Sequence, residues 1–174
     1  MRSTTMWRSG VAVAALVLLT AQTPAPATSG DCPKPEQQTH AFLAAATFAL
    51  AVPRGKLALA TVADEAARER GLMCVTRIPH GRGMIFVFPG PDTARGFWMK
   101  NTLVDLDMVF VAHDGRVTAV SAGVPATQAG TPDANIARRD GVGRYVIELG
   151  AGDAARYGLT IGTALKLPTL KVIE

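Results

Sequence analysis

The chain has 174 residues, of which 48% are hydrophobic and 18% charged, and its formal net charge is +4. Residues 1–27 hold two of the 18 basic residues and none of the 14 acidic ones, so without them 147 residues with a net charge of +2 remain. That length suits one domain with one core. The remaining Arg and Lys are scattered, whereas a nucleic-acid-binding protein needs a concentrated basic stripe, and we expect no nucleic-acid partner.

The first 27 residues have the pattern of a secretory signal peptide. Arg2 and Arg8 supply the positive start, and residues 11–19 form an apolar run of nine, which is too short to span a bilayer. Small residues then offer cleavage after Ala21 or Ala27. We therefore expect export to the periplasm or the medium, with membrane contact only through an uncleaved leader. Lipid attachment is not expected, because Asp31 rather than a small residue precedes the first cysteine.

Residues 28–41 are polar and rich in Pro and Gln, which predicts a disordered tether before a single domain over 42–174. The two cysteines, Cys32 and Cys74, would be exposed to an oxidising compartment, and their even number suggests a disulfide. Closing that loop of roughly 43 residues would stabilise the fold by about 4 kcal/mol. In the alternative, Cys74 is a small buried hydrophobe and Cys32 a free thiol.

The domain begins with a predicted hairpin. Residues 46–52 and 56–62 read as strands that meet at a turn over 53–55, where Pro and Gly favour the reversal. A short helix follows, because Asp64 can cap its N-terminus and Gly71 can end it.

Most of the remaining apolar segments predict strands. Residues 84–88 are apolar on both faces of a strand, and in 95–100 the alternation places Trp98 and Lys100 on the face opposite Phe97. The other predicted elements are a hairpin of 107–111 with 116–121 around a turn at 113–115, strands at 144–149 and 164–167, and a short helix at 153–157.

One segment, 123–143, reads as a long polar loop with Ile136 as its single apolar anchor, and loops of that length are usually functional or disordered. The spacing of the strands predicts a mainly β fold, a small antiparallel β-sandwich or half-open barrel with two short helices.

Five blocks of sequence then carry a resemblance. ADEAARERGLM, GMIFVFP, FWMKNTLVDLDMVFVAHDGRV, RYVIELGAG and YGLTIGTAL occur in an order that resembles domain-of-unknown-function family 192 (DUF192), over about residues 56–168. The resemblance implies a small β-rich fold, often behind a signal peptide, with no established activity. The positions that match the family signature are Gly71, Leu72, Met73, Gly83, Met84, Phe86, Trp98, Met99, Lys100, Asn101, Thr102 and Asp107.

Four of these positions form the candidate ligand-binding site: Trp98, Lys100, Asn101 and Asp107. Lys100 could meet an anionic ligand, and Trp98 offers a flat apolar surface. Two structural interpretations compete with this one. The Asn101 side chain could bond to local backbone, and Asp107 could accept backbone N–H groups or pair with Lys100.

No catalytic constellation is evident in the sequence. Asp105 and Asp107 would share one face of a strand about 7 Å apart, a spacing that could suit paired carboxylates. Members of the family, however, commonly have an uncharged residue at the position of Asp105. The three histidines have no metal-ligand spacing, no serine sits in a nucleophile elbow, and the methionines fall within apolar strands or at the end of the first helix. We therefore predict no catalytic residues, no metal and no cofactor.

Three hypotheses follow for the function. The first is a monomeric, non-enzymatic, exported domain that binds a small ligand or an envelope component. The second is an enzyme acting on an envelope-derived small molecule, with Asp107 as acid or base and Lys100 setting its charge. In the third, the polar set only fixes a junction between strands of a structural envelope domain.

Overall fold

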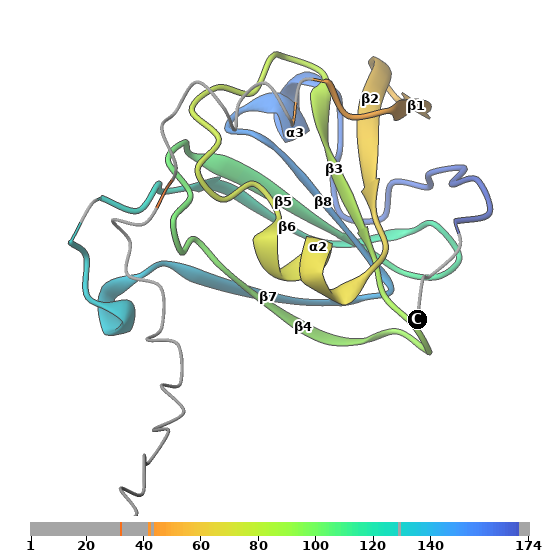
Figure 1. The fold of residues 1–174 in the computed structure, drawn as a ribbon. Coiled ribbons are helices and arrows are strands. Elements are labelled where there is room, and N and C mark those ends of the chain that lie inside the picture. Colours follow the sequence, from red (N-terminus) through yellow and green to blue (C-terminus); the bar gives the residue numbers. More distant parts are fainter. Residues whose placement is uncertain (1–31, 33–41, 43, 129, 171–174) are drawn as a thin grey trace, which may run out of the picture.

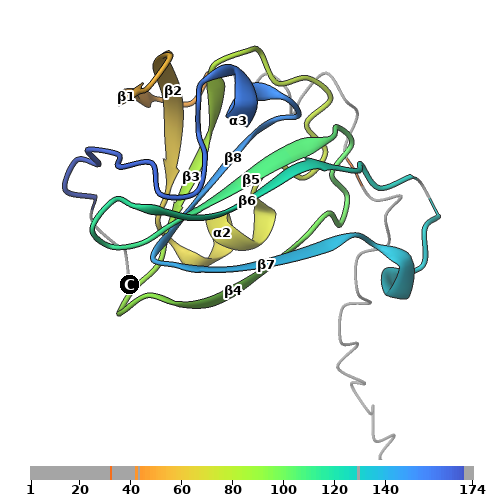
Figure 2. The ribbon, with the colours of Figure 1, turned by 180° about the vertical axis from the view of Figure 1, so that it is seen from behind.

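The computed structural model describes residues 32, 42, 44–128 and 130–170. The predicted leader lies outside these residues, and so does the predicted tether apart from Cys32. Of the described residues, those from Thr47 onward build a mainly β domain (Figures 1 and 2). Its elements are β1 (Thr47–Val52), β2 (Gly55–Val62), α2 (Glu65–Arg70), β3 (Arg82–Val87), β4 (Thr93–Trp98), β5 (Leu106–Val111), β6 (Val117–Val124), η1 (Asp133–Asn135), β7 (Arg138–Gly143), β8 (Tyr145–Gly150) and α3 (Asp153–Arg156).

In the described part of the chain the strands form two sheets, a six-stranded one in the order β1-β2-β3-β8-β5-β6 and a two-stranded one of β4 and β7. All pairings are antiparallel except that of β2 with β3, which α2 connects. The predicted fold class, a small β-sandwich or half-open barrel with two short helices, is confirmed.

The large sheet packs apolar residues on both faces, as the pattern of residues 84–88 predicts. One face packs under α3 and the C-terminal segment, and its core includes Leu59, Ile85 and Ile147. The other face carries Phe86, Met108 and Phe110, and it is covered by α2 and by the β4–β7 ribbon (Figure 1). Tyr145 belongs to the first face and Val146 to the second, in agreement with the alternation along β8.

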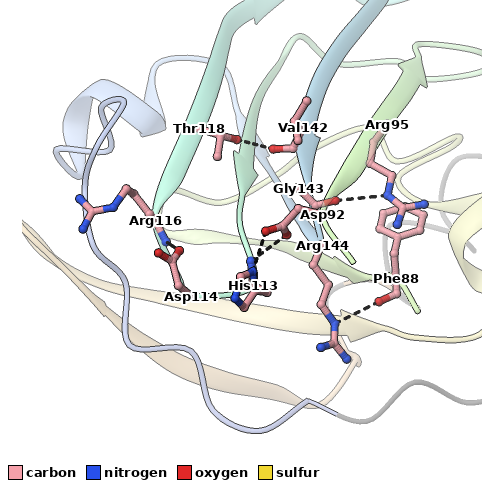
Figure 3. Close-up of polar contacts among 10 residues, drawn as sticks. All are labelled: Phe88, Asp92, Arg95, His113, Asp114, Arg116, Thr118, Val142, Gly143 and Arg144. Carbon is pink, nitrogen blue, oxygen red and sulfur yellow. Dashed lines mark hydrogen bonds and ion pairs between the residues drawn. The ribbon is translucent and has the colours of Figure 1, made fainter. Parts of the chain in front are cut away.

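The predicted loop over 123–143 is wrong in its second half, because β7 occupies 138–143 and pairs with β4. Glycines suggested a loop, but here they let β7 approach the large sheet. A Cβ at Gly141 would lie 2.3 Å from the Phe110 ring, and one at Gly143 would lie 2.5 Å from the Val111 carbonyl oxygen. Thr118 of β6 also donates to the Val142 carbonyl (Figure 3). In β7, glycine therefore marks close packing between the two sheets.

The predicted last strand over 164–167 is also wrong. Only an isolated bridge between Arg116 and Ala164 forms, and Leu165 donates its N–H to Gly115 in the β5–β6 turn over 2.8 Å. The segment crosses the end of that hairpin, and Pro168 then lacks the N–H that a longer ladder would need.

Cys32 and Cys74 form a disulfide whose Cα atoms are 5.5 Å apart. The N–H of Cys74 donates to the carbonyl of Asn101 over 2.6 Å. Cys74 and Asn101 both have positive φ, 64° and 53° respectively. The disulfide thus joins the segment after α2 to the N-terminal side of the domain, beside the junction between β4 and β5. Among the described residues, no helix is long and apolar enough to cross a membrane.

Candidate functional site

A cleft of about 430 Å³ is lined by α2, the end of β3 with the residues that follow it, and the second half of β4. Its walls combine aromatic rings, the polar side of α2 and one carboxyl from the large sheet. The lining residues that matter below are Arg68, Gly71, Phe86, Phe88, Arg95, Phe97, Trp98, Lys100 and Glu148.

The local sequence fixes where α2 starts and stops. The Asp64 carboxylate accepts the N–H of Ala67 over 2.8 Å, which satisfies one of the donors at the helix N-terminus. Gly71 ends the helix with φ 47° and ψ −131°, a conformation that an L side chain rarely adopts. A Cβ at Gly71 would lie 3.1 Å from Phe86 and 3.8 Å from Oε2 of Glu148. The missing side chain therefore opens the cleft above these two residues.

Glu148 lies in the middle of the apolar face of the large sheet. Its neighbours across the ladders are Met84 of β3 and Met108 of β5, and the residue is only 5% exposed. Within the described part of the chain, no donor or cation contacts its carboxyl group. Burial raises the pKa of Glu148 to about 8, so the carboxyl is mostly protonated at neutral pH. A neutral carboxyl can both donate and accept a hydrogen bond at the base of the cleft.

Three phenylalanine rings connect this base to the mouth of the cleft. Phe97 of β4 packs edge-on against Phe86 at 5.1 Å between ring centroids and against Phe88 at 6.1 Å. Such perpendicular contacts are the favoured geometry of aromatic pairs, and they hold the rings in place. The rings form a firm apolar wall that begins beside Glu148 and Gly71 and ends at Phe88.

Two arginines gather at the Phe88 end. The guanidinium carbon of Arg95 lies 4.3 Å from the Phe88 ring centroid, and that of Arg68 lies 5.4 Å from it. Arg68 also donates to the carbonyls of Ala63 and Val87, and Arg95 donates to that of Gly143 (Figure 3 shows Arg95 and Phe88). Burial and the charge of Arg68 lower the pKa of Arg95. Neither guanidinium forms a salt bridge with another described residue.

Of the four predicted site residues, Trp98 and Lys100 line the cleft. The Lys100 ammonium lies 4.9 Å from the centroid of the Trp98 ring. The guanidinium carbon of Arg138 also lies 4.9 Å from that centroid. Lys100 is only 8% exposed and pairs with Asp133 of η1 over 3.0 Å. Its charge is therefore already partnered from the protein side.

Asn101 and Asp107 do not line this cleft. Asn101 is buried at the strand junction, where its side-chain oxygen has no hydrogen-bond partner among the described residues. Asp107 is fully buried and accepts the N–H groups of Gly123 and Ala154, each over 2.8 Å. Asp107 thereby connects β6 and the first turn of α3 to β5. Asp105 is exposed and accepts the N–H of Ala126 over 2.8 Å.

A second polar group lies at the other end of β5. His113 donates its backbone N–H to Asp92 over 2.8 Å, and its Nδ1 lies 2.7 Å from the second carboxylate oxygen (Figure 3). The hydrogen bond and charge of Asp92 raise the pKa of His113. For Asp92, partial burial works toward a higher pKa, but the contacts with His113 outweigh it and the pKa is lowered. This pair ties the β3–β4 connection to the β5–β6 turn.

The sequence pattern alone did not identify Glu148, Arg68 or Arg95 as site residues. A signal for Glu148 is present, because it is the one acid in a strand of otherwise apolar residues and shares a face with Val146. The arginines carry no such signal, since arginine on a short helix or an edge strand is ordinary. Among the described residues, no group of three His, Cys, Asp or Glu side chains converges as a metal site.

Comparison with known proteins gives the family. The profile of the DUF192 family, described as Uncharacterized ACR, matches residues 48–167. A crystal structure of a candidate transcription regulator from Sinorhizobium meliloti 1021 is similar, with 32% identity, a TM-score of 0.55, and coverage of 68% of this chain and 89% of that one. A protein of unknown function from Novosphingobium aromaticivorans DSM 12444 is 28% identical, also with a TM-score of 0.55, and covers 68% of this chain and 82% of its own. No curated protein matches. The suspected resemblance is thus confirmed, and the chain belongs to the DUF192 family.

Proposed function

We propose that this domain binds a small molecule in the cleft above Glu148. The ligand lies along the aromatic wall of Phe86, Phe97 and Phe88, with Trp98 also lining the cleft, and a neutral polar group of the ligand pairs with the Glu148 carboxyl. The observation that carries this proposal is the position of Glu148: a buried carboxyl, unpartnered within the described residues, at the base of the cleft.

Native proteins leave few buried polar groups without a partner. No described residue hydrogen-bonds to the Glu148 carboxyl, so it is available to a polar group of a ligand in the cleft. The cleft volume of about 430 Å³ is also in the range of small-molecule sites, which combine apolar walls with a few polar groups. The Gly71 conformation supports the same proposal, because it leaves the carboxyl accessible from the cleft.

An enzymatic function is the second candidate, and one observation favours it. A carboxylic acid that stays protonated near neutral pH can serve as a general acid, and burial places the pKa of Glu148 at about 8. Glu148 is therefore the candidate general acid of this cleft. Asp107, the acid or base of the sequence-based hypothesis, already accepts two backbone N–H groups away from the cleft.

The binding proposal can be tested with an uncharged fluorescent probe, N-phenyl-1-naphthylamine, titrated into the purified full-length protein. We expect saturable binding at one site. Trp98→Ala removes an aromatic ring that lines the cleft and should weaken binding about 2- to 13-fold, the range that the loss of an aromatic contact of about 0.5–1.5 kcal/mol implies. Val142→Ala is the matched control, because Val142 is 50% exposed on β7 outside the cleft.

The outcomes separate three functions. Binding that Trp98→Ala weakens and Val142→Ala leaves unchanged supports the cleft. Absence of saturable binding contradicts the proposal and favours a structural domain. Turnover of a bound metabolite that Glu148→Gln abolishes, with binding retained, would establish the enzyme.

We further propose that the domain is exported and works in the periplasm or outside the cell. The signal-like start and the Cys32–Cys74 disulfide support this location. We do not propose a role in transcription regulation from the description of the Sinorhizobium relative. The basic residues of the present chain are scattered, and they suit a small anion better than a nucleic-acid backbone.

A further inference from the structure

The mouth of the cleft has a chemical character of its own. Arg68 comes from α2 and Arg95 from β4, and both approach the ring of Phe88. Their guanidinium carbons therefore lie within about 10 Å of each other, about one Debye length at 0.1 M salt. Burial, and after it the like charge of Arg68, lowers the pKa of Arg95.

The fold holds both side chains in place through backbone carbonyls. The charge of Asp92, which is itself paired with His113, also acts on Arg95, but these two described residues form no salt bridge with each other. Arg68 donates to two backbone carbonyls, at 2.6 and 3.1 Å, and Arg95 donates to the Gly143 and Pro89 carbonyls, at 3.3 and 3.5 Å. A guanidinium has more N–H donors than these contacts use. Glu65 and Glu69 also line the cleft, but in the described part of the chain neither forms a salt bridge with Arg68 or Arg95.

We infer that the cleft takes small organic anions, whose acidic group binds Arg68 and Arg95 while an apolar body lies along Phe88, Phe97 and Phe86 toward Glu148. This inference rests on the proposed function, since it assigns the class of ligand to the same cleft. Carboxylate, sulfonate and phosphate groups share the planar or branched oxygen arrangement that guanidinium binds best.

The positions of the rings set the size of such a ligand. Phe86 and Phe88 are two residues apart on one face of the chain leaving β3, which corresponds to about 7 Å. An acidic group at Phe88 and a neutral polar group at Glu148 thus require an apolar body at least one ring long. Inorganic phosphate or sulfate could bind the two arginines but is too small to contact Glu148 at the same time. An inorganic anion would therefore occupy only one end of the cleft.

A matched pair of dyes tests this inference. N-phenyl-1-naphthylamine and 8-anilinonaphthalene-1-sulfonate share one aryl amine skeleton and differ in the sulfonate. In the full chain carrying Trp7→Phe, Trp98 is the single tryptophan, so its fluorescence reports binding in the cleft. We expect Arg95→Gln and Arg68→Gln each to weaken sulfonate-dye binding at least 5-fold and to change the affinity of the uncharged dye less than 2-fold.

Two controls sharpen the comparison. Arg116→Gln removes the same charge on an exposed turn outside the cleft and should leave both affinities unchanged (Figure 3). Arg95→Lys keeps the charge and should restore part of the preference. Benzoate should displace the sulfonate dye at a concentration at least 10-fold lower than benzamide requires. That result would show that a carboxylate can bind in place of the sulfonate.

The results distinguish the two proposals. If the uncharged dye binds in the cleft but the arginine variants weaken both dyes equally, or neither, the anion inference is wrong and the binding function stands. If neither dye changes Trp98 fluorescence, the binding function fails, and the anion inference fails with it.

Discussion

Oε2 of Glu148 lies 3.8 Å from the point where a side chain on Gly71 would begin. The two residues come from different parts of the sequence, one ending a helix and the other within a central strand. Their contact explains why the cleft reaches a carboxyl in the interior of the apolar face. A glycine at the end of α2 lets solvent and ligands reach the one acid of that face.

The pH dependence of stability should report Glu148. The unfolded chain releases this proton near pH 4.5, whereas the folded protein keeps it up to about pH 8. The unfolded state therefore binds fewer protons between these values, and the stability of the protein falls as pH rises through the window, by roughly 1.4 kcal/mol per unit. Glu148→Gln removes this loss and should be more stable than the unmodified protein at pH 9 by on the order of 3–5 kcal/mol.

Urea unfolding at pH 4, 6 and 9 measures the difference between the two proteins. It should be small at pH 4 and grow with pH. Parallel pH profiles for the two proteins would mean that the Glu148 carboxyl is not held in its protonated form.

Gly71→Ala should both destabilise the protein and close the cleft. The backbone conformation at Gly71 disfavours a side chain, at a cost of about 1–3 kcal/mol. The new methyl group would also lie 3.1 Å from Phe86 and above Glu148. We expect a lower melting temperature and weaker binding of N-phenyl-1-naphthylamine. Gly123→Ala is the control, since Gly123 also has positive φ (59°) but faces open space; it should lose stability and keep its dye affinity.

Asp107→Asn should affect stability and not binding. The carboxylate accepts two backbone N–H groups in a fully buried position, and an amide offers one oxygen where two are needed. We expect a loss of about 2–4 kcal/mol in urea unfolding, as for a buried hydrogen-bonded charge. The dye affinity of the folded fraction should stay the same. A variant with normal stability and lost binding would return Asp107 to the ligand site.

Reduction of the Cys32–Cys74 disulfide should lower stability by about 4 kcal/mol, because the bond closes a long loop in the unfolded chain. The sequence separation of the two cysteines is 42. Cys32→Ser should reproduce the effect, and the reductant should then change nothing further. Equal melting temperatures for oxidised and reduced protein would show that the bridge adds no stability.

Replacement of Asp92 should lower the pKa of His113. The histidine pKa is raised by the hydrogen bond and charge of Asp92, so stability from this pair is present below the usual value of 6.5 and lost as pH rises through the raised one. NMR titration of His113 should give a lower pKa in Asp92→Asn than in the unmodified protein. Asp114→Asn should lower it less, because Asp114 acts only through its charge. Equal titrations in all three proteins would rule out the pair in solution.

How far the sequence predicts this protein depends on the residue type that carries each feature. Strands such as β3 and β8 are predictable because β-branched and apolar residues repeat along them. β7 is not, since Gly141 packs closely on Phe110 and Gly143 on the backbone of Val111, which no local pattern shows. Trp98 and Lys100 were predicted from the family signature and lie in the cleft. Glu148 was not predicted because its apolar surroundings come from Met84 and Met108 of the two neighbouring strands. These residues lie opposite Glu148 only in the folded sheet.

In our proposal, Glu148 is a protonated acid at the base of a ligand-binding cleft. The most direct measurement is the ¹³C NMR titration of its side-chain carboxyl, assigned with Glu148→Gln, in the absence and presence of saturating N-phenyl-1-naphthylamine. We predict a midpoint near pH 8 for the protein alone and a change in both chemical shift and midpoint when the dye binds. A midpoint near 4.5 that the bound dye does not alter would contradict the account.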